Sequence, residues 1–174
     1  MTRAASAAAP LRVRDTPEPE DPARVEALVA ATGFFSPEEI AVARDLVEER
    51  LGEGLASGYH FVFASRGSRL AGYTCFGPVP ATASSFDLYW IAVDPADQGQ
   101  GVGRALMRDT EGRIAALGGT RVYADTSGRA QYAPTRAFYE RAGYTQAALL
   151  EDFFAPGDAK VIYVRVLGAP IARP

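Results

Sequence analysis

The first half of the chain carries apolar residues first at helical and then at strand spacing. Between residues 21 and 52 they recur three and four positions apart, which predicts two helices. Asp21 is the expected N-cap of the first helix and Ser36 that of the second, where two glutamates follow in the first turn. Aromatic and β-branched runs, separated by Gly, Ser and Pro turns, then predict an antiparallel meander of strands over residues 59–65, 70–77 and 86–93.

The second half changes to the order strand, glycine turn, helix. Asp94-Pro95 ends the meander, glycines cluster after it, and apolar residues at helical spacing predict a long helix that ends at Gly118-Gly119. The other predicted elements are strands at residues 11–14 and 121–125, a short helix at 134–141 and a closing hairpin of residues 144–154 and 160–167. Together they predict one mixed α/β domain over residues 11–167, with flexible tails at residues 1–10 and 168–174.

The composition excludes several classes of function and adds little to the predicted fold. The 174 residues hold 18 Lys and Arg against 21 Asp and Glu, so no basic surface for nucleic acid is expected. Cys75 is the only cysteine, which excludes an internal disulfide and a cysteine-rich zinc site and favours a cytoplasmic location without a metal. No run of about 18 apolar residues is present, so no membrane contact is expected.

A glycine-rich turn, Gln98 to Arg104, stands between the strand at 86–93 and the long helix. Without Cβ atoms, the backbone N–H groups of such a turn can crowd around an anion, and the positive end of the helix dipole adds to the attraction. We therefore expect a ligand that carries phosphate; the alternative is a turn that only closes the helix onto the sheet. Arg104-Ala105 stands where a P-loop needs Lys-Ser/Thr, and the glycine spacing does not fit the Rossmann fingerprint.

Two motifs in order resemble the GNAT superfamily of acyl-CoA-dependent acetyltransferases. Gln98-Gly99-Gln100-Gly101-Val102-Gly103 resembles its Gln/Arg-x-x-Gly-x-Gly/Ala pyrophosphate loop, and residues 135–144 resemble its later Ala-x-x-Phe/Leu-Tyr-Glu-x-x-Gly-Phe/Tyr helix. The resemblance implies an α/β (α+β) fold with a mixed, mostly antiparallel sheet of about six to seven strands and about four flanking helices. It also implies a V-shaped splay between the two central parallel strands, residues 86–93 and 121–125.

For the cofactor, the resemblance implies acetyl-CoA, with its pantetheine arm in the V, bonded to the backbone of Ile91, Ala92 and Val93. Its pyrophosphate would rest on the N–H groups of Gln98, Gly99, Gln100, Gly101, Val102, Gly103 and Arg104. Tyr132 stands where many relatives carry an Asn that bonds the cofactor arm. Tyr132 or Arg129 is therefore expected to contact the cofactor or the acceptor, the alternative being that Tyr132 is a packed loop aromatic.

Two residues are candidates for the acid and base chemistry of acyl transfer. Tyr139 matches the family tyrosine that protonates the departing CoA thiolate, a role that suits a phenol; the alternative is a core aromatic on a buried helix face. Asp87 is the candidate base that deprotonates the attacking amine. Period-2 alternation puts Asp87 on the same face of its strand as Tyr89 and Ile91. The alternative is a solvated strand-end acid, with ordered water as the path for the proton.

The acceptor is expected near Phe34, Phe35, Tyr89 and Asp152, because these segments flank the acyl end in the resembling fold. The alternative for Phe34 and Phe35 is a hydrophobic cap without a role in binding. Aromatic and acidic residues suit an amine with an apolar portion. His60 is interpreted as a core or rim histidine, and Cys75 as a buried, inert thiol.

The resulting hypothesis is an N-acetyltransferase that moves an acetyl group directly from acetyl-CoA to the primary amine of a small molecule in a ternary complex. The alternatives are a non-catalytic acyl-CoA-binding regulatory module and a protein or peptide N-acetyltransferase. The sequence is compatible with a homodimer.

Overall fold

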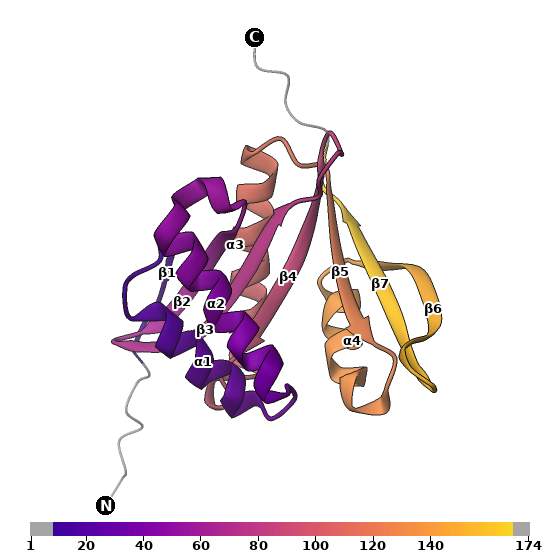
Figure 1. Cartoon of the computed structure of the whole chain (residues 1–174), viewed down its shortest axis with the longest axis horizontal. Helices are drawn as coiled ribbons and strands as arrows, with labels where there is room; N and C mark the ends of the chain where they lie inside the picture. Colours follow the sequence, from indigo (N-terminus) through magenta and orange to yellow (C-terminus); the bar gives the residue numbers. More distant parts are fainter. Residues whose placement is uncertain (1–8, 169–174) are drawn as a thin grey trace, which may run out of the picture.

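The computed structural model describes residues 9–168, which form one seven-stranded sheet with four α-helices (Figure 1). The strands are β1 (Leu11–Arg14), β2 (His60–Arg66), β3 (Arg69–Pro78), β4 (Ser85–Val93), β5 (Arg121–Ser127), β6 (Thr145–Ala155) and β7 (Asp158–Val166). The α-helices are α1 (Asp21–Thr32), α2 (Pro37–Glu53), α3 (Val102–Ala116) and α4 (Ala133–Arg141), and the short 3₁₀ turns are η1 (Gly54–Ser57), η2 (Pro95–Asp97) and η3 (Ala130–Tyr132). The predicted tails lie outside the described residues except for residues 9, 10 and 168.

The sheet opens between its two central strands. The strand order is β1-β2-β3-β4-β5-β7-β6, and among the described strands only β4 and β5 pair in parallel. Their pairing runs from Ser85 to Leu88 and stops there. Below this point Figure 1 shows the two strands diverging. The predicted fold class, including its V-shaped splay, is therefore confirmed, and β4 presents an unpaired edge from Tyr89 to Val93.

A β-bulge in β4 reverses which residues face which side of the sheet. Trp90 pairs with Cys75 and Leu88 pairs with Phe76, so Tyr89 is an extra residue without a partner on β3. Before the bulge Leu88 faces the cluster under α3, whereas after it Ile91 packs on that side. The prediction that Asp87 shares a face with Ile91 is therefore wrong, because an inserted residue shifts the period-2 alternation by one position.

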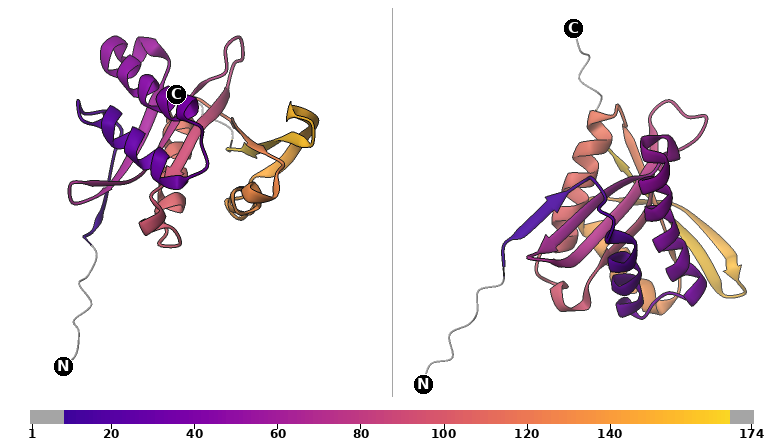
Figure 2. Two further views of the ribbon diagram at one scale, coloured as in Figure 1. Left: turned by 60° about the horizontal axis from the view of Figure 1, so that its bottom comes forward. Right: turned by 60° about the vertical axis from the view of Figure 1, so that its left-hand side comes forward.

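Two helical layers cover the sheet and enclose two cores. Helices α1 and α2 bury Val25, Val29 and Val47 against β2, β3 and β4. Helix α3 buries Leu106 and Ile114 against the opposite face, in a cluster that also contains side chains from α4, β5 and β7. Figure 2 shows the pair α1 and α2 on one side of the strands and α3 on the other. The V between β4 and β5 is therefore flanked by α2 on one face and by α3 and α4 on the other.

Local sequence signals explain most helix ends, with one correction. Ser36 accepts a hydrogen bond from the N–H of Glu39, and the Glu39 side chain accepts one from the N–H of Ser36, so the predicted cap is a complete capping box. Asp21 is not the N-cap of α1; Glu20 occupies that position. The Asp21 carboxylate is fully buried and instead pairs with the guanidinium groups of Arg14 and Arg24.

Candidate functional site

The loop between β4 and α3 offers unpaired backbone N–H groups at the start of a helix. Gly101 precedes the first residue of α3, and its carbonyl oxygen accepts the first intrahelical hydrogen bond, from the N–H of Ala105. The N–H groups of residues 102–104 therefore lie before the ladder begins, where an anion is stabilised. Gly99 and Gly101 adopt positive φ values of 74° and 81°, and a Cβ atom on either would meet open space. A ligand can thus approach the backbone here.

Gly103 has a different reason to lack a side chain. A Cβ atom at this position would lie 3.0 Å from Cε2 of Phe138, so its absence lets α3 approach α4 closely. The three glycines of the motif therefore divide into two that shape the loop and one that packs two helices together.

A buried carboxylate holds this loop in place. Asp97 is 2% exposed and forms ion pairs with Nε of Arg66 at 3.0 Å and with an Nη atom of Arg69 at 2.6 Å. Both arginines lie at the β2–β3 turn, so two neighbouring strands fix the residue that precedes Gln98. The side chain of Gln100 adds a brace by donating to the carbonyl oxygen of Ala96 at 2.7 Å.

The unpaired edge of β4 leads directly to this loop. The N–H of Asp94 donates to the carbonyl of Ala71 on β3, so by strand alternation the backbone groups of Ile91 and Val93 point away from β3. They face the open side of the V, where they can bond an extended ligand. The Val93 carbonyl oxygen also accepts a long hydrogen bond from the Gln98 side chain, at 3.5 Å. The backbone of Ala92 points toward β3 by the same alternation, which separates Ala92 from the two other predicted cofactor contacts.

Tyr139 lies on the buried face of α4 at the other side of the V. Its side chain is 4% exposed and packs among Phe138, Tyr144 and Tyr163, with ring centroids 5.6 to 5.7 Å away. Burial, and then the charge of Asp125, raises the pKa of the Tyr139 phenol far above its ordinary range. The phenol therefore keeps its proton at neutral pH and has a proton to donate.

A hollow of about 400 Å³ lies on the α2 side of β4 and β5. Asp87 and Asp125 line it together with apolar and aromatic side chains from α2, β4 and β5. Burial and then the charge of Asp125 raise the pKa of the Asp87 carboxyl, and Lys160 partly offsets this. Lys160 itself forms an ion pair with Asp125. A carboxylate with a raised pKa is a better proton acceptor than an ordinary aspartate.

The structure separates the predicted acceptor residues. Tyr89 lines the hollow with Asp87. Phe35 packs its ring 5.0 Å from Trp90, another lining residue, so Phe35 supports the wall. Asp152 does not line the hollow; it sits at positive φ and accepts a hydrogen bond from the N–H of Gly157 in the β6–β7 hairpin.

Phe34 and Tyr132 meet across the V. Their ring centroids are 5.6 Å apart, and the Tyr132 hydroxyl donates to the carbonyl oxygen of Phe34 at 3.4 Å. This contact joins the loop between α1 and α2 to the loop after β5. Arg129 packs against the Tyr132 ring and forms an ion pair with Asp158. Tyr132 thus packs against protein groups on both sides.

His60 and Cys75 are buried or packed, as interpreted from the sequence. His60 stacks on Phe76 with ring centroids 5.3 Å apart, and burial and the charge of Arg50 lower the pKa of its imidazole. Cys75 is fully buried, and burial raises the pKa of its thiol. A buried thiol with a raised pKa is a poor nucleophile, as the sequence suggested.

Three residues at this hollow were not predicted from the sequence: Tyr123, Asp125 and Lys160. Tyr123 and Asp125 alternate on β5 and share the Asp87 face, because Asp87 lies opposite Tyr123 in the parallel pair. The period-2 pattern of residues 121–125 indicates that Tyr123 and Asp125 share a face of β5. It does not indicate the register between β4 and β5, which places Asp125 near Asp87.

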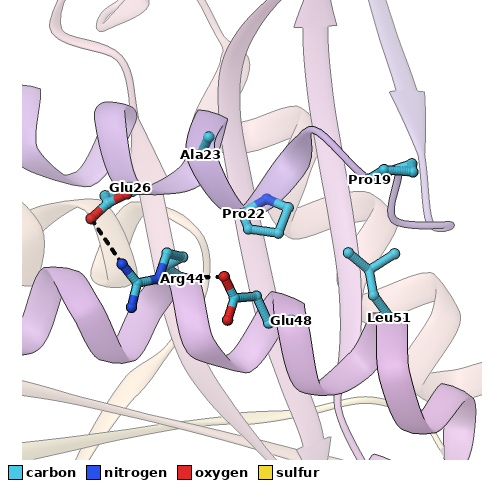
Figure 3. A pocket seen from close by; sticks show the side chains of 7 residues that line it. All are labelled: Pro19, Pro22, Ala23, Glu26, Arg44, Glu48 and Leu51. Atoms are coloured by element: carbon cyan, nitrogen blue, oxygen red, sulfur yellow. Dashed lines mark hydrogen bonds and ion pairs between the residues drawn. The ribbon is translucent and has the colours of Figure 1, made fainter.

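A second hollow, of about 490 Å³, lies between α1 and α2 and contains none of the predicted site residues (Figure 3). Arg44 reaches from α2 to Glu26 of α1 at 3.4 Å and to Glu48 at 3.5 Å within it. Within residues 9–168, no group of three His, Cys, Asp or Glu side chains is placed to hold a metal ion. None of the helices over the same range has the length and apolarity needed to cross a membrane.

Comparisons with known proteins agree on one family. The family model of the acetyltransferase (GNAT) domain matches residues 57–146. The solved structure of a protein from Desulfovibrio desulfuricans, described as a candidate acetyltransferase of the GNAT family, is 48% identical, covers 90% of this chain and 99% of its own, and has a TM-score of 0.89. No curated protein matches the chain.

More distant structures share the fold alone. An aminoglycoside 6′-N-acetyltransferase complexed with coenzyme A is 16% identical, with 94% of this chain and 99% of that chain covered and a TM-score of 0.72. The ribosomal-protein-S18-alanine N-acetyltransferase of Escherichia coli is 18% identical, with 94% and 98% covered and a TM-score of 0.70. One of these acts on a small molecule and the other on a protein, so the fold does not decide the acceptor.

Proposed function

The chain belongs to the GNAT family of acetyltransferases, and we propose that it transfers the acetyl group of acetyl-CoA to the primary amine of a small molecule. The membership makes the protein an acyltransferase. The proposal adds the acyl donor, the acceptor class and the residues that carry the reaction.

Acetyl-CoA fits the groups along β4 and the start of α3. The pyrophosphate binds the free N–H groups after Gly101, and the pantetheine arm bonds the backbone of Ile91 and Val93 as an added strand. The coenzyme A bound to the distant aminoglycoside acetyltransferase supports this choice of ligand. The acetyl end then lies in the V between Tyr139 and the hollow that contains Asp87.

The reaction is a direct transfer between two bound substrates. Asp87, or water next to it, takes a proton from the ammonium, and the amine nitrogen attacks the thioester carbonyl carbon. The backbone N–H of Ile91 stabilises the oxyanion that forms. The C–S bond then breaks, and the Tyr139 hydroxyl donates its proton to the departing CoA thiolate. The nitrogen releases its second proton as the amide forms, and this proton returns through water to the Tyr139 oxygen. Binding both substrates in one geometry supplies a large part of the acceleration.

The single observation that carries the proposal is the unpaired edge of β4 from Tyr89 to Val93. Backbone groups at the centre of a sheet are expected to be paired, so an open pair of strands needs a ligand. This edge runs from the hollow with Asp87 to the anion-binding start of α3. One elongated ligand along the edge would therefore reach both places.

The small-molecule acceptor is supported by the contact between Phe34 and Tyr132, which spans the V beside the hollow. A peptide would need to pass this contact, whereas a compact amine fits beneath it.

The test is to mix the purified protein with acetyl-CoA and a panel of amines (amino acids, polyamines, amino sugars, arylalkylamines and short peptides) and to follow the release of free CoA thiol. Release that depends on a small amine supports the proposal. Saturable acetyl-CoA binding without release on any amine contradicts it and favours a regulatory acyl-CoA-binding module. Release with peptides alone makes the protein a peptide acetyltransferase.

A further inference from the structure

The two carboxylates of the hollow, Asp87 and Asp125, differ in their ion pairing. Asp125 forms an ion pair with the Lys160 ammonium, whereas Asp87 has no ion-pair partner within residues 9–168. Lys160 is also held from a second side, because its Nζ lies 4.7 Å from the centroid of the Phe153 ring. Among the described residues, Asp87 is therefore the carboxylate of the hollow without an ion-pair partner, and Lys160 compensates its charge only in part.

Aromatic rings form much of the wall around this charge. Tyr59, Tyr89, Trp90 and Tyr123 line the hollow, and the first two meet edge to face with centroids 5.8 Å apart. Ring faces attract a cation and pack well against flat or apolar groups. A volume of about 400 Å³ is that of a site for a small ligand.

The contact between Phe34 and Tyr132 limits the length of a ligand in the hollow. Phe35, the neighbour of Phe34, packs on Trp90 in the wall, so this contact lies beside the hollow. An acceptor that extends from the hollow past Phe35 toward Phe34 meets the Tyr132 ring and its hydrogen bond to Phe34.

We propose that the hollow selects compact acceptors that carry one ammonium group on an aromatic or apolar body, and rejects acceptors with two or more ammonium groups. This inference rests on the proposed function and names the substrate class of that same site. A second ammonium group in the hollow meets an Asp125 that Lys160 already neutralises. It must displace Lys160 or lie against the aromatic wall without a paired counter-charge, which is costly.

The experiment compares phenethylamine with diaminopentane as acceptors and measures kcat/KM from the release of CoA thiol. We expect the wild-type protein to prefer the monoamine by about tenfold or more. A wild-type preference for the diamine overturns the inference and leaves the proposed function intact. Absence of release with every amine of the panel is instead the failure of the proposed function.

Lys160→Met provides the second arm. Methionine keeps an unbranched apolar stem against Phe153 and removes the charge, so Asp125 becomes free to bind a second ammonium group. The ratio of kcat/KM for the diamine to kcat/KM for the monoamine should therefore rise about tenfold. The matched control is Arg108→Met, which removes one positive charge from a side chain that is 78% exposed on α3. An unchanged ratio in Lys160→Met, or an equal change in the control, overturns the inference.

Binding provides a readout that does not need turnover. Calorimetric titration of both amines into the protein with CoA present should give the tighter constant for the monoamine in the wild type and a much smaller difference between the two amines in Lys160→Met. Equal binding of the two amines to both proteins contradicts the inference, whatever the rates are.

Discussion

At the scale of single residues, the site depends on ionisable side chains held away from water. Tyr139 and Asp87 both have raised pKa values, because burial is the largest influence on each. For the phenol a raised pKa keeps the proton in place, although it makes the phenol a weaker acid. For the carboxylate it increases basicity, which suits the role of base proposed for Asp87. Burial thus favours the proposed proton acceptor directly, whereas the proposed proton donor depends on its position beside the departing thiolate.

Asp87→Asn tests the base and separates activity from stability. Because the pKa of Asp87 is raised in the folded protein, the folded state binds this proton more tightly than the unfolded state. Its ionisation therefore lowers stability as the pH rises through the raised pKa, and the cost is absent below the ordinary pKa. Asp87→Asn removes the cost, so at neutral pH the variant should unfold at the same denaturant concentration as wild type or at a higher one.

The activity of the same variant should fall about 10²-fold or more if Asp87 is the base. The wild-type rate should rise with pH through the raised pKa of Asp87, and this limb should be lost in the variant. Rate measurements from acidic to neutral pH, with denaturant titrations alongside, check both parts. A variant with the wild-type rate and pH profile would assign the proton to water instead.

Residue roles were predictable from sequence only where a motif fixed their position. Tyr139 and the glycines follow from the two motifs. Asp125 and Lys160 were missed because their importance arises from a register between strands distant in sequence. The face of Ile91 was mispredicted for a related reason, since the bulge at Tyr89 is an insertion that no local pattern marks.

At the scale of elements, the proposed function assigns acetyl-CoA binding to the loop before α3 and acceptor access to the contact between Phe34 and Tyr132. Most helix and strand spans were predictable because capping, glycine stops and period-2 runs are local signals. The ends differ by one or two residues in several strands, as at β3, which begins at Arg69 and ends at Pro78. The splay itself came from the family resemblance, since no local property of β4 or β5 predicts where their pairing stops.

Gly101→Val tests the loop. Valine at a φ of 81° is strained by about 1–3 kcal/mol, and relief of that strain moves the N–H groups that follow. Acetyl-CoA binding by calorimetry should weaken about tenfold or more. The matched control is Gly112→Ala, also in open space but inside α3, which should bind normally and gain about 0.5–1 kcal/mol of stability. Normal binding by Gly101→Val would show that the loop does not hold the cofactor.

Tyr132→Ala tests the contact between the two loops. Removing the ring opens the V, so long amines such as tetrapeptides should show a lower KM while phenethylamine changes little. Tyr132→Phe keeps the ring against Phe34 and loses only the hydrogen bond at 3.4 Å, so it should behave as wild type. If peptides are rejected equally by all three proteins, the contact does not limit acceptor length. The KM for acetyl-CoA, measured in parallel, reports any separate contact of Tyr132 with the cofactor.

At the scale of the whole molecule, the sheet is joined across its centre by a short stretch. Strands β1 to β4 lie on one side and β5, β7 and β6 on the other, and β4 pairs with β5 over the four residues from Ser85 to Leu88. A ligand along the open edge of β4 therefore contacts both halves. Binding of acetyl-CoA should stabilise the molecule as one unit.

Thermal unfolding measures this stabilisation. At a ligand concentration about 100 times the Kd, the gain is about 2.7 kcal/mol, which corresponds to a rise in Tm of about 5–10 °C for a chain of this size. Scanning calorimetry with and without acetyl-CoA checks the value. Desulfo-coenzyme A and free adenosine diphosphate, which lack the thioester, separate the contribution of the loop from that of the V. A Tm that does not respond to acetyl-CoA would be incompatible with binding in the V.

The central claim is that Tyr139 protonates the CoA thiolate inside the V. The most direct measurement determines kcat and the acetyl-CoA Kd for wild type, Tyr139→Phe and Tyr163→Phe. Tyr163 is the matched control, because it belongs to the same ring cluster and its hydroxyl donates to Glu140 at 3.1 Å. We predict that Tyr139→Phe lowers kcat about 10²-fold or more with an unchanged Kd, while Tyr163→Phe keeps the wild-type kcat. Equal kcat values in wild type and Tyr139→Phe would contradict the claim.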